Sequence, residues 1–222
     1  GIMLILSKIN NGIAVSMLVS VLINNLMRVW ARLVLNFYKD ESYLTHTLPV
    51  KKSTLYLSKV LCGLITMLTS TIVIAISLLI CYYSKENIEL LKNSLNIVAN
   101  LYESSITSLL IQLFTLIFLE FTFILLTGYI GIILGHKSNN NKMLKSCLCG
   151  FLTYMASSII ILLVVYISGL FNSDIMNIFT STTFTLNIFK TILLIAIISY
   201  LVLIIIEYII GLKTIDKGVN ID

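Results

Sequence analysis

A run of 24 residues without a charged side chain, Val60 to Tyr83, most restricts what this chain can fold into. A helix of about 20 apolar residues is long enough to cross the hydrocarbon core of a bilayer. The whole chain has 58% hydrophobic and 11% charged residues, whereas soluble domains have roughly 45–50% and about 25%. Because a soluble core cannot hide this much apolar surface, the sequence predicts that lipid surrounds most of the chain.

The other long apolar runs extend this interpretation to the whole sequence. Backbone groups in hydrocarbon must be hydrogen-bonded within the crossing segment, so these runs are expected to be helices. The sequence therefore predicts an all-α, polytopic integral membrane helical bundle, forming a single transmembrane domain over residues 1–222. Trp30 lies beside Arg28 and Arg32, as expected at the interfacial end of the first crossing. The five expected spans lie near residues 10–30, 60–83, 106–134, 147–171 and 188–210.

Residues 84–105 are too polar to span a membrane but carry a helical pattern. Their apolar side chains recur at alternating steps of three and four, which places them on one face of a helix. We expect an amphipathic helix on the outer membrane surface or on the outer ends of other spans. A coiled-coil contact is the alternative interpretation. The residues of this face are Ile88, Leu91, Leu95, Val98 and Tyr102.

Lysine and arginine are distributed unevenly over the segments that connect these spans. One side carries eleven of the 15 and the other carries four, and the positive-inside rule places the richer side in the cytosol. This predicts a multi-pass protein of the cell (plasma) membrane with a cytosolic C-terminus and Gly1 outside. Since an outside start without a signal peptide is unusual, we expect that an earlier span is missing and that the intact protein has six. We read the net charge of +5 as this topology signal and expect no nucleic-acid partner.

Residues that could form a catalytic or metal site are not grouped in this sequence. It contains no HExxH motif and no paired carboxylates in one loop, and the four cysteines lack metal-ligand spacing to the histidines. The segment 131–138, GIILGHKS, differs from a phosphate-binding loop because its glycines are too close and His136 separates Gly135 from Lys137. His46 and His136 are expected to lie against the backbone or a partner. We expect no catalytic residue, metal or cofactor on this chain, and no enzyme activity.

Glu120 lies at the centre of the third expected span, where a charge costs at least ~2.5 kcal/mol. Two interpretations remain open: a carboxylate on a substrate or proton path, or a protonated acid hydrogen-bonded to a neighbouring helix. The first would support an alternative function, an ion-gradient-driven secondary transporter or channel that uses Glu120. Glu207 lies near the expected cytosolic end of the last span, and we expect its side chain to extend to the interface.

Small and polar residues within the apolar runs indicate contacts between helices. Gly131 and Gly135 form a GxxxG pair, which lets two helices approach closely in lipid. Asn24 and Asn25 in the first expected span are predicted to make hydrogen bonds between helices rather than to bind a substrate.

The longest polar interruption on the predicted cytosolic side is the segment 36–59, NFYKDESYLTHTLPVKKSTLYLSK. Phe37, Leu44 and Leu48 share one face of a predicted helix, and the charged triplet KDE lies on the opposite face. Pro49 is expected to end this helix because it cannot continue the hydrogen-bond ladder and restricts the residue before it. A short amphipathic helix and a break, just ahead of a membrane span, are typical of a docking element.

This segment resembles the cytosolic segment of permease subunits of bacterial ABC transporters of the type-two exporter class. In that family a phrase of the form DE-x-Y-L-T-x-T-L-P-V, followed by Ser-Lys near the next span, lies between the second and third membrane helices. The matching residues here are Asp40, Glu41, Tyr43, Leu44, Thr45, Thr47, Leu48, Pro49, Val50, Ser58 and Lys59.

The resemblance implies a six-helix permease that works as a homodimer or heterodimer with an ABC ATPase subunit on a separate chain. ATP would bind to the partner ATPase and not to this chain. Residues Asp40 to Val50 would contact the ATPase and pass its movement to the membrane helices. The expected function is therefore that of a permease subunit of an ATP-driven exporter, coupled to its ATPase through the segment 36–59.

Overall fold

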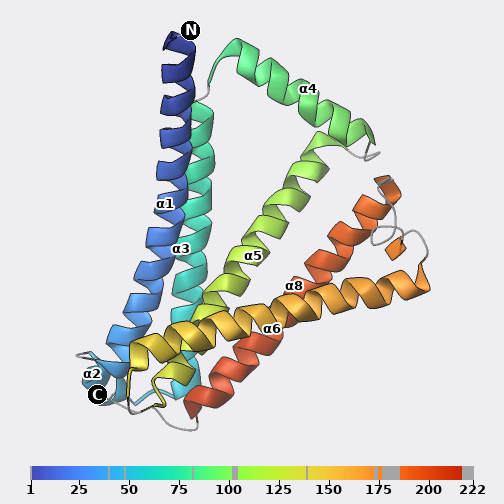
Figure 1. The fold of residues 1–222 in the computed structure, drawn as a ribbon. Helices are drawn as coiled ribbons and strands as arrows, with labels where there is room; N and C mark the ends of the chain where they lie inside the picture. Colours follow the sequence, from blue (N-terminus) through green and yellow to red (C-terminus); the bar gives the residue numbers. More distant parts are fainter. Residues whose placement is uncertain are drawn as a thin grey trace. The chain divides into compact units, whose positions relative to one another are not determined.

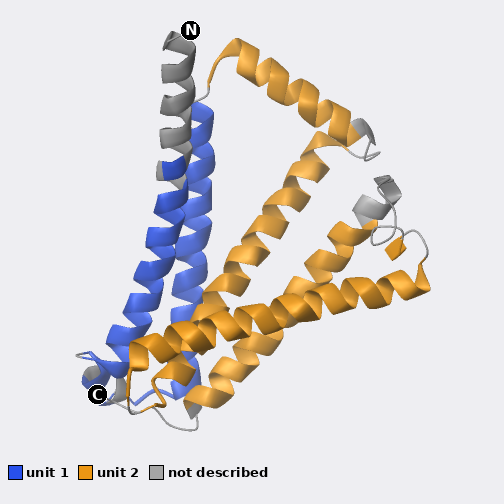
Figure 2. Cartoon of the chain, in the orientation of Figure 1, with its two compact units in different colours: residues 1–81, 221–222 blue, residues 82–220 orange. Residues whose placement is uncertain are grey.

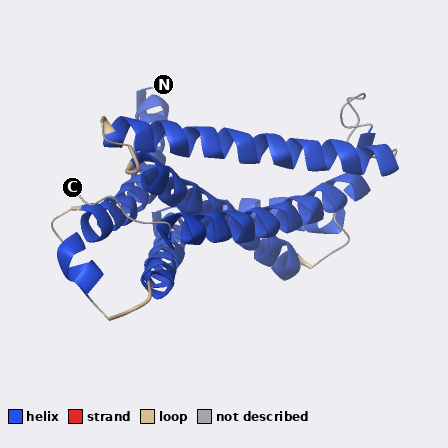
Figure 3. Cartoon of the chain, turned by 90° about the horizontal axis from the view of Figure 1, so that it is seen from below, coloured by secondary structure: helices blue, strands red, loops and turns tan. Residues whose placement is uncertain are grey.

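The computed structural model describes residues 2–39, 41–47, 49–81, 83–101, 105–138, 140–172, 175–176 and 186–216. All regular secondary structure in these ranges is helical, and none of it is strand (Figure 3). This agrees with the predicted all-α class. The helices are labelled in Figure 1. Their bounds are α1 Ile2–Tyr38, α2 Ser42–Thr47, α3 Lys52–Cys81, α4 Lys85–Leu101, α5 Ile106–Gly135, α6 Lys142–Phe171 and α8 Leu186–Asp216.

The chain divides into two compact units, which Figure 2 colours separately. The first unit comprises residues 1–81 and 221–222 and contains α1, α2 and α3. The second comprises residues 82–220 and contains α4, α5, α6 and α8. The predicted single transmembrane domain stays a prediction.

Four helices within the described residues are long and apolar enough to cross a membrane. Most of their surface is not covered by protein: only 6% of the most apolar window of α6 is buried inside the chain. Because apolar surface of this extent needs an apolar solvent, this is a membrane-embedded helical protein. The four spans are Lys52–Ile80, Ile106–Gly135, Lys142–Phe171 and Thr191–Ile215.

The expected first crossing, near residues 10–30, is helical but is not among these four spans. It lies inside α1, which continues to Tyr38. The sequence ARLVLNFY after Trp30 contains no glycine or proline, and Val29, Leu33 and Phe37 are buried at steps of four. The helix therefore continues beyond the predicted interfacial end at Trp30, and the count of five spans stays a prediction.

In the first unit, α1 and α3 run side by side (Figure 1). Leu33 from α1 and Met67 from α3 are among the side chains with almost no exposed surface. The side-chain amide of Asn25 donates a hydrogen bond to Ser70 Oγ at 2.8 Å. This confirms the predicted interhelical bond for Asn25, whereas Asn24 is exposed.

The predicted amphipathic segment 84–105 contains α4, Lys85–Leu101. Ser84 precedes the helix, and its hydroxyl accepts a hydrogen bond from the backbone N–H of Asn87 at 3.1 Å, as an N-cap does. Ile88, Leu91 and Val98 of the predicted apolar face are exposed within the chain. That face therefore remains available to a bilayer surface or a partner, while Tyr102 lies outside the described residues.

In the second unit, α5 packs against both α6 and α8. The crossing of α5 and α6 is very close: a Cβ added to Gly131 would lie 2.6 Å from Gly150 Cα. A Cβ on Gly135 would collide with the backbone and hydroxyl of Ser146. The two contact residues on α6, Ser146 and Gly150, are also four residues apart. A pair of small residues on α6 therefore faces the glycine pair on α5. The predicted role of Gly131 and Gly135 in close helix packing is therefore confirmed.

Candidate functional site

The segment 36–59 forms the connection between α1 and α3 in the first unit. The chain turns after α1, where the N–H of Ser42 donates to Lys39 O at 2.7 Å, and α2 follows. Phe37 thus belongs to α1, so the prediction that it shares one helix with Leu44 and Leu48 is wrong. The helix α2 ends at Thr47, before Pro49, as predicted.

The side chain of Asn36 joins the end of α1, the turn before α2 and the first part of α3. The side-chain amide of Asn36, near the end of α1, donates a hydrogen bond to Glu41 Oε2 in the turn. The Asn36 carbonyl oxygen accepts a hydrogen bond from Lys59 Nζ on α3. Charge-assisted hydrogen bonds are stronger than neutral ones. Asn36 therefore ties the turn before α2 to both long helices.

Aromatic side chains form the buried part of the same connection. Phe37, Tyr38 and Tyr56 are almost completely buried, and Phe37 and Tyr38 have ring centroids 6.5 Å apart. Burial raises the pKa of the Tyr38 phenol. Ser42, the first residue of α2, is buried as well. The start of α2 is thus held by packing in addition to the Asn36 hydrogen bonds.

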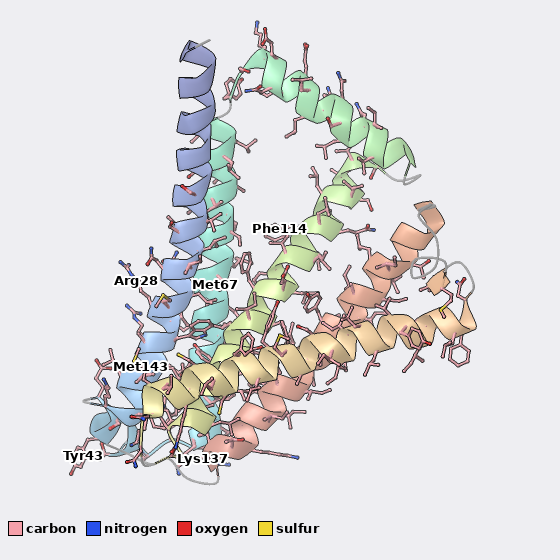
Figure 4. All side chains as sticks on the ribbon, in the orientation of Figure 1. Arg28, Tyr43, Met67, Phe114, Lys137 and Met143 are labelled. Atoms are coloured by element: carbon pink, nitrogen blue, oxygen red, sulfur yellow. The ribbon has the colours of Figure 1, made fainter. Side chains whose placement is uncertain are left out.

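The predicted ATPase-contact residues form the outer part of the connection. Tyr43 is 75% exposed and extends away from the ribbon in Figure 4, and Val50 is exposed. Glu41, Thr47 and Pro49 are exposed too. An exposed tyrosine next to aliphatic and charged groups has the composition of a protein contact surface. Of the other predicted contacts, Leu44 and Thr45 lie in α2 with side chains outside the described set, and Asp40 and Leu48 lie outside the described residues.

Glu120 lies on an exposed side of α5, not in the interior of its unit. Among the described residues it has no hydrogen-bond partner. Thr115 and Thr122 do not reach it, because each donates to its own helix backbone at 2.8 Å. The structure therefore does not place Glu120 against a polar neighbour, and its role on a substrate path stays a prediction.

The buried acid of the second unit is Glu207, with 2% of its surface exposed. Thr127 Oγ1 on α5 lies 3.1 Å from each carboxyl oxygen, and Ser157 Oγ on α6 donates to Oε1 at 3.2 Å. The expectation that Glu207 extends to the interface is wrong. The helix α8 continues to Asp216, and the side chain turns inward between α5 and α6.

The sequence contains a signal for this placement that the analysis of single residues missed. On α8 the buried positions recur every four residues: Ser199, Leu203, Glu207, Gly211 and Ile215. Small or polar residues at this spacing on a uniformly apolar helix indicate the side that packs against other helices. Glu207 belongs to that side.

The hydroxyl protons that can be donated to the Glu207 carboxyl group can be counted. The Thr127 hydroxyl has one proton, and it also lies 2.8 Å from Phe123 O, which can only accept. Thr127 can therefore donate to the carboxyl group or to the backbone, but not to both at full strength. No Lys, Arg or His of the described chain forms an ion pair with Glu207. Ser157 is thus the donor that serves only the carboxyl group.

Aromatic rings pack near this cluster and join the same three helices. The Phe123 ring centroid lies 5.8 Å from that of Tyr154 on α6 and 5.6 Å from that of Tyr200 on α8. These distances are in the range in which aromatic pairs stabilise packing. Phe123 is one helical turn before Thr127, so the carboxyl cluster lies beside a packed aromatic contact.

The remaining candidates take structural positions. His136 is buried at the end of α5, and its Nδ1 lies 2.9 Å from Ile132 O, so the prediction that it lies against the backbone is confirmed. The side chain of His46 is outside the described set. Cys62, Cys147 and Cys149 are free thiols. Within the described ranges no three His, Cys, Asp or Glu side chains gather at a distance that could hold a metal ion.

Searches against protein-family models, curated proteins and solved structures found no match to this chain. The fold therefore defines the class to which the chain belongs, a membrane-embedded helical protein with four long apolar helices in its described part. Within that class its two distinctive features are the exposed α1–α3 connection and the buried Glu207 cluster.

Proposed function

We propose that this chain is the permease subunit of an ATP-binding-cassette exporter and that the segment 36–59 is its coupling segment. One observation carries the proposal. The connection between α1 and α3 presents an exposed Tyr43 outward while its inner side is fixed by buried aromatic rings and Asn36.

A coupling element has two physical requirements, and this connection meets both. It must offer an accessible surface to the ATPase, which the exposed side chains of α2 and Val50 supply. It must also be attached firmly enough that a push on it moves the membrane helices. Packed cores transmit displacement because they have little free volume, and Phe37 and Tyr56 supply such a core on α1 and α3.

The rest of the proposal follows from the resemblance of residues 40–50 to exporter permeases. ATP binds to a separate ABC ATPase, and a second permease subunit, identical or different, completes the transporter. The four apolar helices support a membrane path for the substrate. The plasma membrane, a cytosolic C-terminus and the direction of export belong to this same proposal.

The proposal can be tested with two tyrosines of equal exposure. Tyr43 is 75% and Tyr83 is 76% exposed. Exposed tyrosines at interface centres commonly contribute 2 kcal/mol or more to binding, which is roughly thirtyfold in affinity. Tyr43→Ala should therefore lower co-purification of a co-expressed partner ABC ATPase by about tenfold or more.

Tyr83→Ala is the matched control, because Tyr83 lies beyond the far end of α3 and should leave co-purification unchanged. Equal retention of the ATPase by both variants would reject the coupling segment as the docking element. Loss in both variants at normal protein yield would place the contact elsewhere.

The buried acid gives one observation in favour of the alternative, an ion-gradient-driven transporter. A carboxyl group inside a membrane bundle commonly marks an ion or proton path, and the structure buries Glu207 rather than Glu120. Transport by reconstituted protein that continues without any ATPase and stops when the ion gradient is removed would favour this alternative.

A further inference from the structure

A groove runs along the second unit between α6 and α8. Its volume is about 550 Å³, and it is lined by side chains of these two helices only. The walls are mainly aliphatic, with Ile160 and Val164 from α6 and Ile198 and Val202 from α8. These four side chains are also well exposed within the chain. The groove is therefore an open, elongated apolar surface of the size that accommodates a small organic molecule.

The lining also contains polar groups that an apolar lipid chain does not need. Glu207 and Ser157 line it, and they are joined by the 3.2 Å hydrogen bond. Ser199 lines it two helical turns from Glu207, about 12 Å along α8. Ser199 is a buried residue, with 8% of its surface exposed.

The charged groups that line the groove are acidic and not basic. Glu207 is the acid in its lining, and no basic side chain lines the groove. The hydroxyls of Thr127 and Ser157 can serve the carboxyl group but carry no positive charge. When this group ionises, its counter-charge must come from outside the described chain, and a bound ammonium group supplies it most directly.

We propose that the groove between α6 and α8 binds a cationic amphiphile, with its ammonium group at Glu207 and its hydrocarbon chain along α6 and α8 toward Ser199. The hydrocarbon chain of the amphiphile replaces bilayer lipid against Ile160 and Val202 at little cost in free energy. Its ammonium group forms a charge-assisted hydrogen bond with Glu207, which lipid hydrocarbon cannot form. This inference concerns binding and does not depend on coupling to an ATPase.

The test is saturation binding of radiolabelled dodecylammonium to the purified full chain in detergent, with dodecanol as an uncharged probe of equal length. The expected result is one saturable dodecylammonium site per chain and at least about tenfold weaker binding of dodecanol, since hydrogen bonds to charged groups contribute about 1.5–3 kcal/mol. Glu207→Gln should weaken dodecylammonium binding by a similar factor. Glu120→Gln removes an exposed acid from the same unit and should leave binding unchanged.

A second pair of variants serves if Glu207→Gln fails to fold. Val202 lines the groove and Leu201 beside it does not, although the two are similarly exposed. Val202→Trp should fill the groove and abolish the saturable site, whereas Leu201→Trp should retain it.

Three results would overturn the proposal. Equal binding of dodecanol and dodecylammonium would show that the groove holds any hydrocarbon chain. Full binding by Val202→Trp, or by a folded Glu207→Gln, would place the site elsewhere. Loss of binding in Glu120→Gln equal to that in Glu207→Gln would show a diffuse charge effect. Reduced ATPase co-purification in Tyr43→Ala is independent of all three, so failure of this inference is distinguishable from failure of the proposed function.

Discussion

At the residue scale, Glu207 shows how a single acid can be placed inside a membrane unit. Its carboxyl group is enclosed by α5 and α6 and bonded to hydroxyls from both. Ser157 is the donor without a competing acceptor, so it contributes most clearly to the stability of the acid. The position of Glu207 near the end of the last apolar run had instead predicted a side chain that extends to the membrane interface.

Ser157→Ala should lower the free energy of unfolding by about 0.5–2 kcal/mol, the range of hydrogen bonds inside membrane bundles and to buried acceptors. The substitution removes a donor and leaves Glu207 Oε1 buried. Thermal unfolding of the detergent-solubilised protein measures the effect.

Its neighbour on α6 supplies the control for this prediction. Ser158 is only partly buried and donates to its own helix at Tyr154 O, 2.9 Å away. Ser158→Ala should therefore change the free energy of unfolding by less than about 0.5 kcal/mol. An equal loss in both variants would show that the Glu207 bond contributes nothing specific.

At the element scale, the apolar runs predicted where long helices form but not how far they extend. The expected spans 106–134 and 147–171 correspond closely to α5 and α6. The helix α3 extends beyond the expected span 60–83 at its start, because it begins at Lys52 within a polar stretch that carries no helix breaker after Pro49. Where a helix ends inside a polar stretch depends on tertiary contacts, such as the burial of Tyr56. The hydrophobic pattern along the sequence does not show these contacts.

The close crossing of α5 and α6 yields a prediction about two glycines that face each other. Gly131→Ala should destabilise the second unit by about 1–3 kcal/mol, because its Cβ would lie 2.6 Å from backbone atoms that cannot rotate away. Thermal unfolding of the purified protein measures the effect.

Gly150→Ala is the control across the same crossing. A Cβ on Gly150 meets its nearest atom, Gly131 Cα, at 3.8 Å, which is ordinary van der Waals contact. Its stability should therefore stay close to that of the original chain. A larger loss for Gly150→Ala than for Gly131→Ala would contradict the helix register described above.

At the scale of the whole molecule, composition alone was sufficient to predict a helical membrane protein. The reason is that a soluble core cannot bury the apolar surface of 58% hydrophobic residues. The candidate sites were less accessible to prediction. The exposure of Tyr43 follows from its place in a polar connection. In contrast, the burial of Glu207 required three helices from distant parts of the sequence to meet. The four-residue spacing on α8 indicates which side of that helix is packed, but not which helices pack against it.

The predicted sidedness is tested by cysteine labelling at the two exposed tyrosines. In a variant without native cysteines, Tyr43→Cys should resist a membrane-impermeant maleimide in intact cells and react after the cells are opened. Tyr83→Cys should react in intact cells, since the uneven Lys and Arg distribution places it outside. The reverse pattern would show that the positive-inside assignment is inverted.

The central claim is that the α1–α3 connection receives an ABC ATPase. The most direct measurement is photo-crosslinking in living cells from a benzoylphenylalanine placed at position 43, with position 83 as the comparison. The account predicts a covalent adduct with an ATPase that contains a phosphate-binding loop, formed from position 43 and not from position 83. An adduct with a different protein, or no adduct from position 43 while the ATPase is expressed, would contradict it.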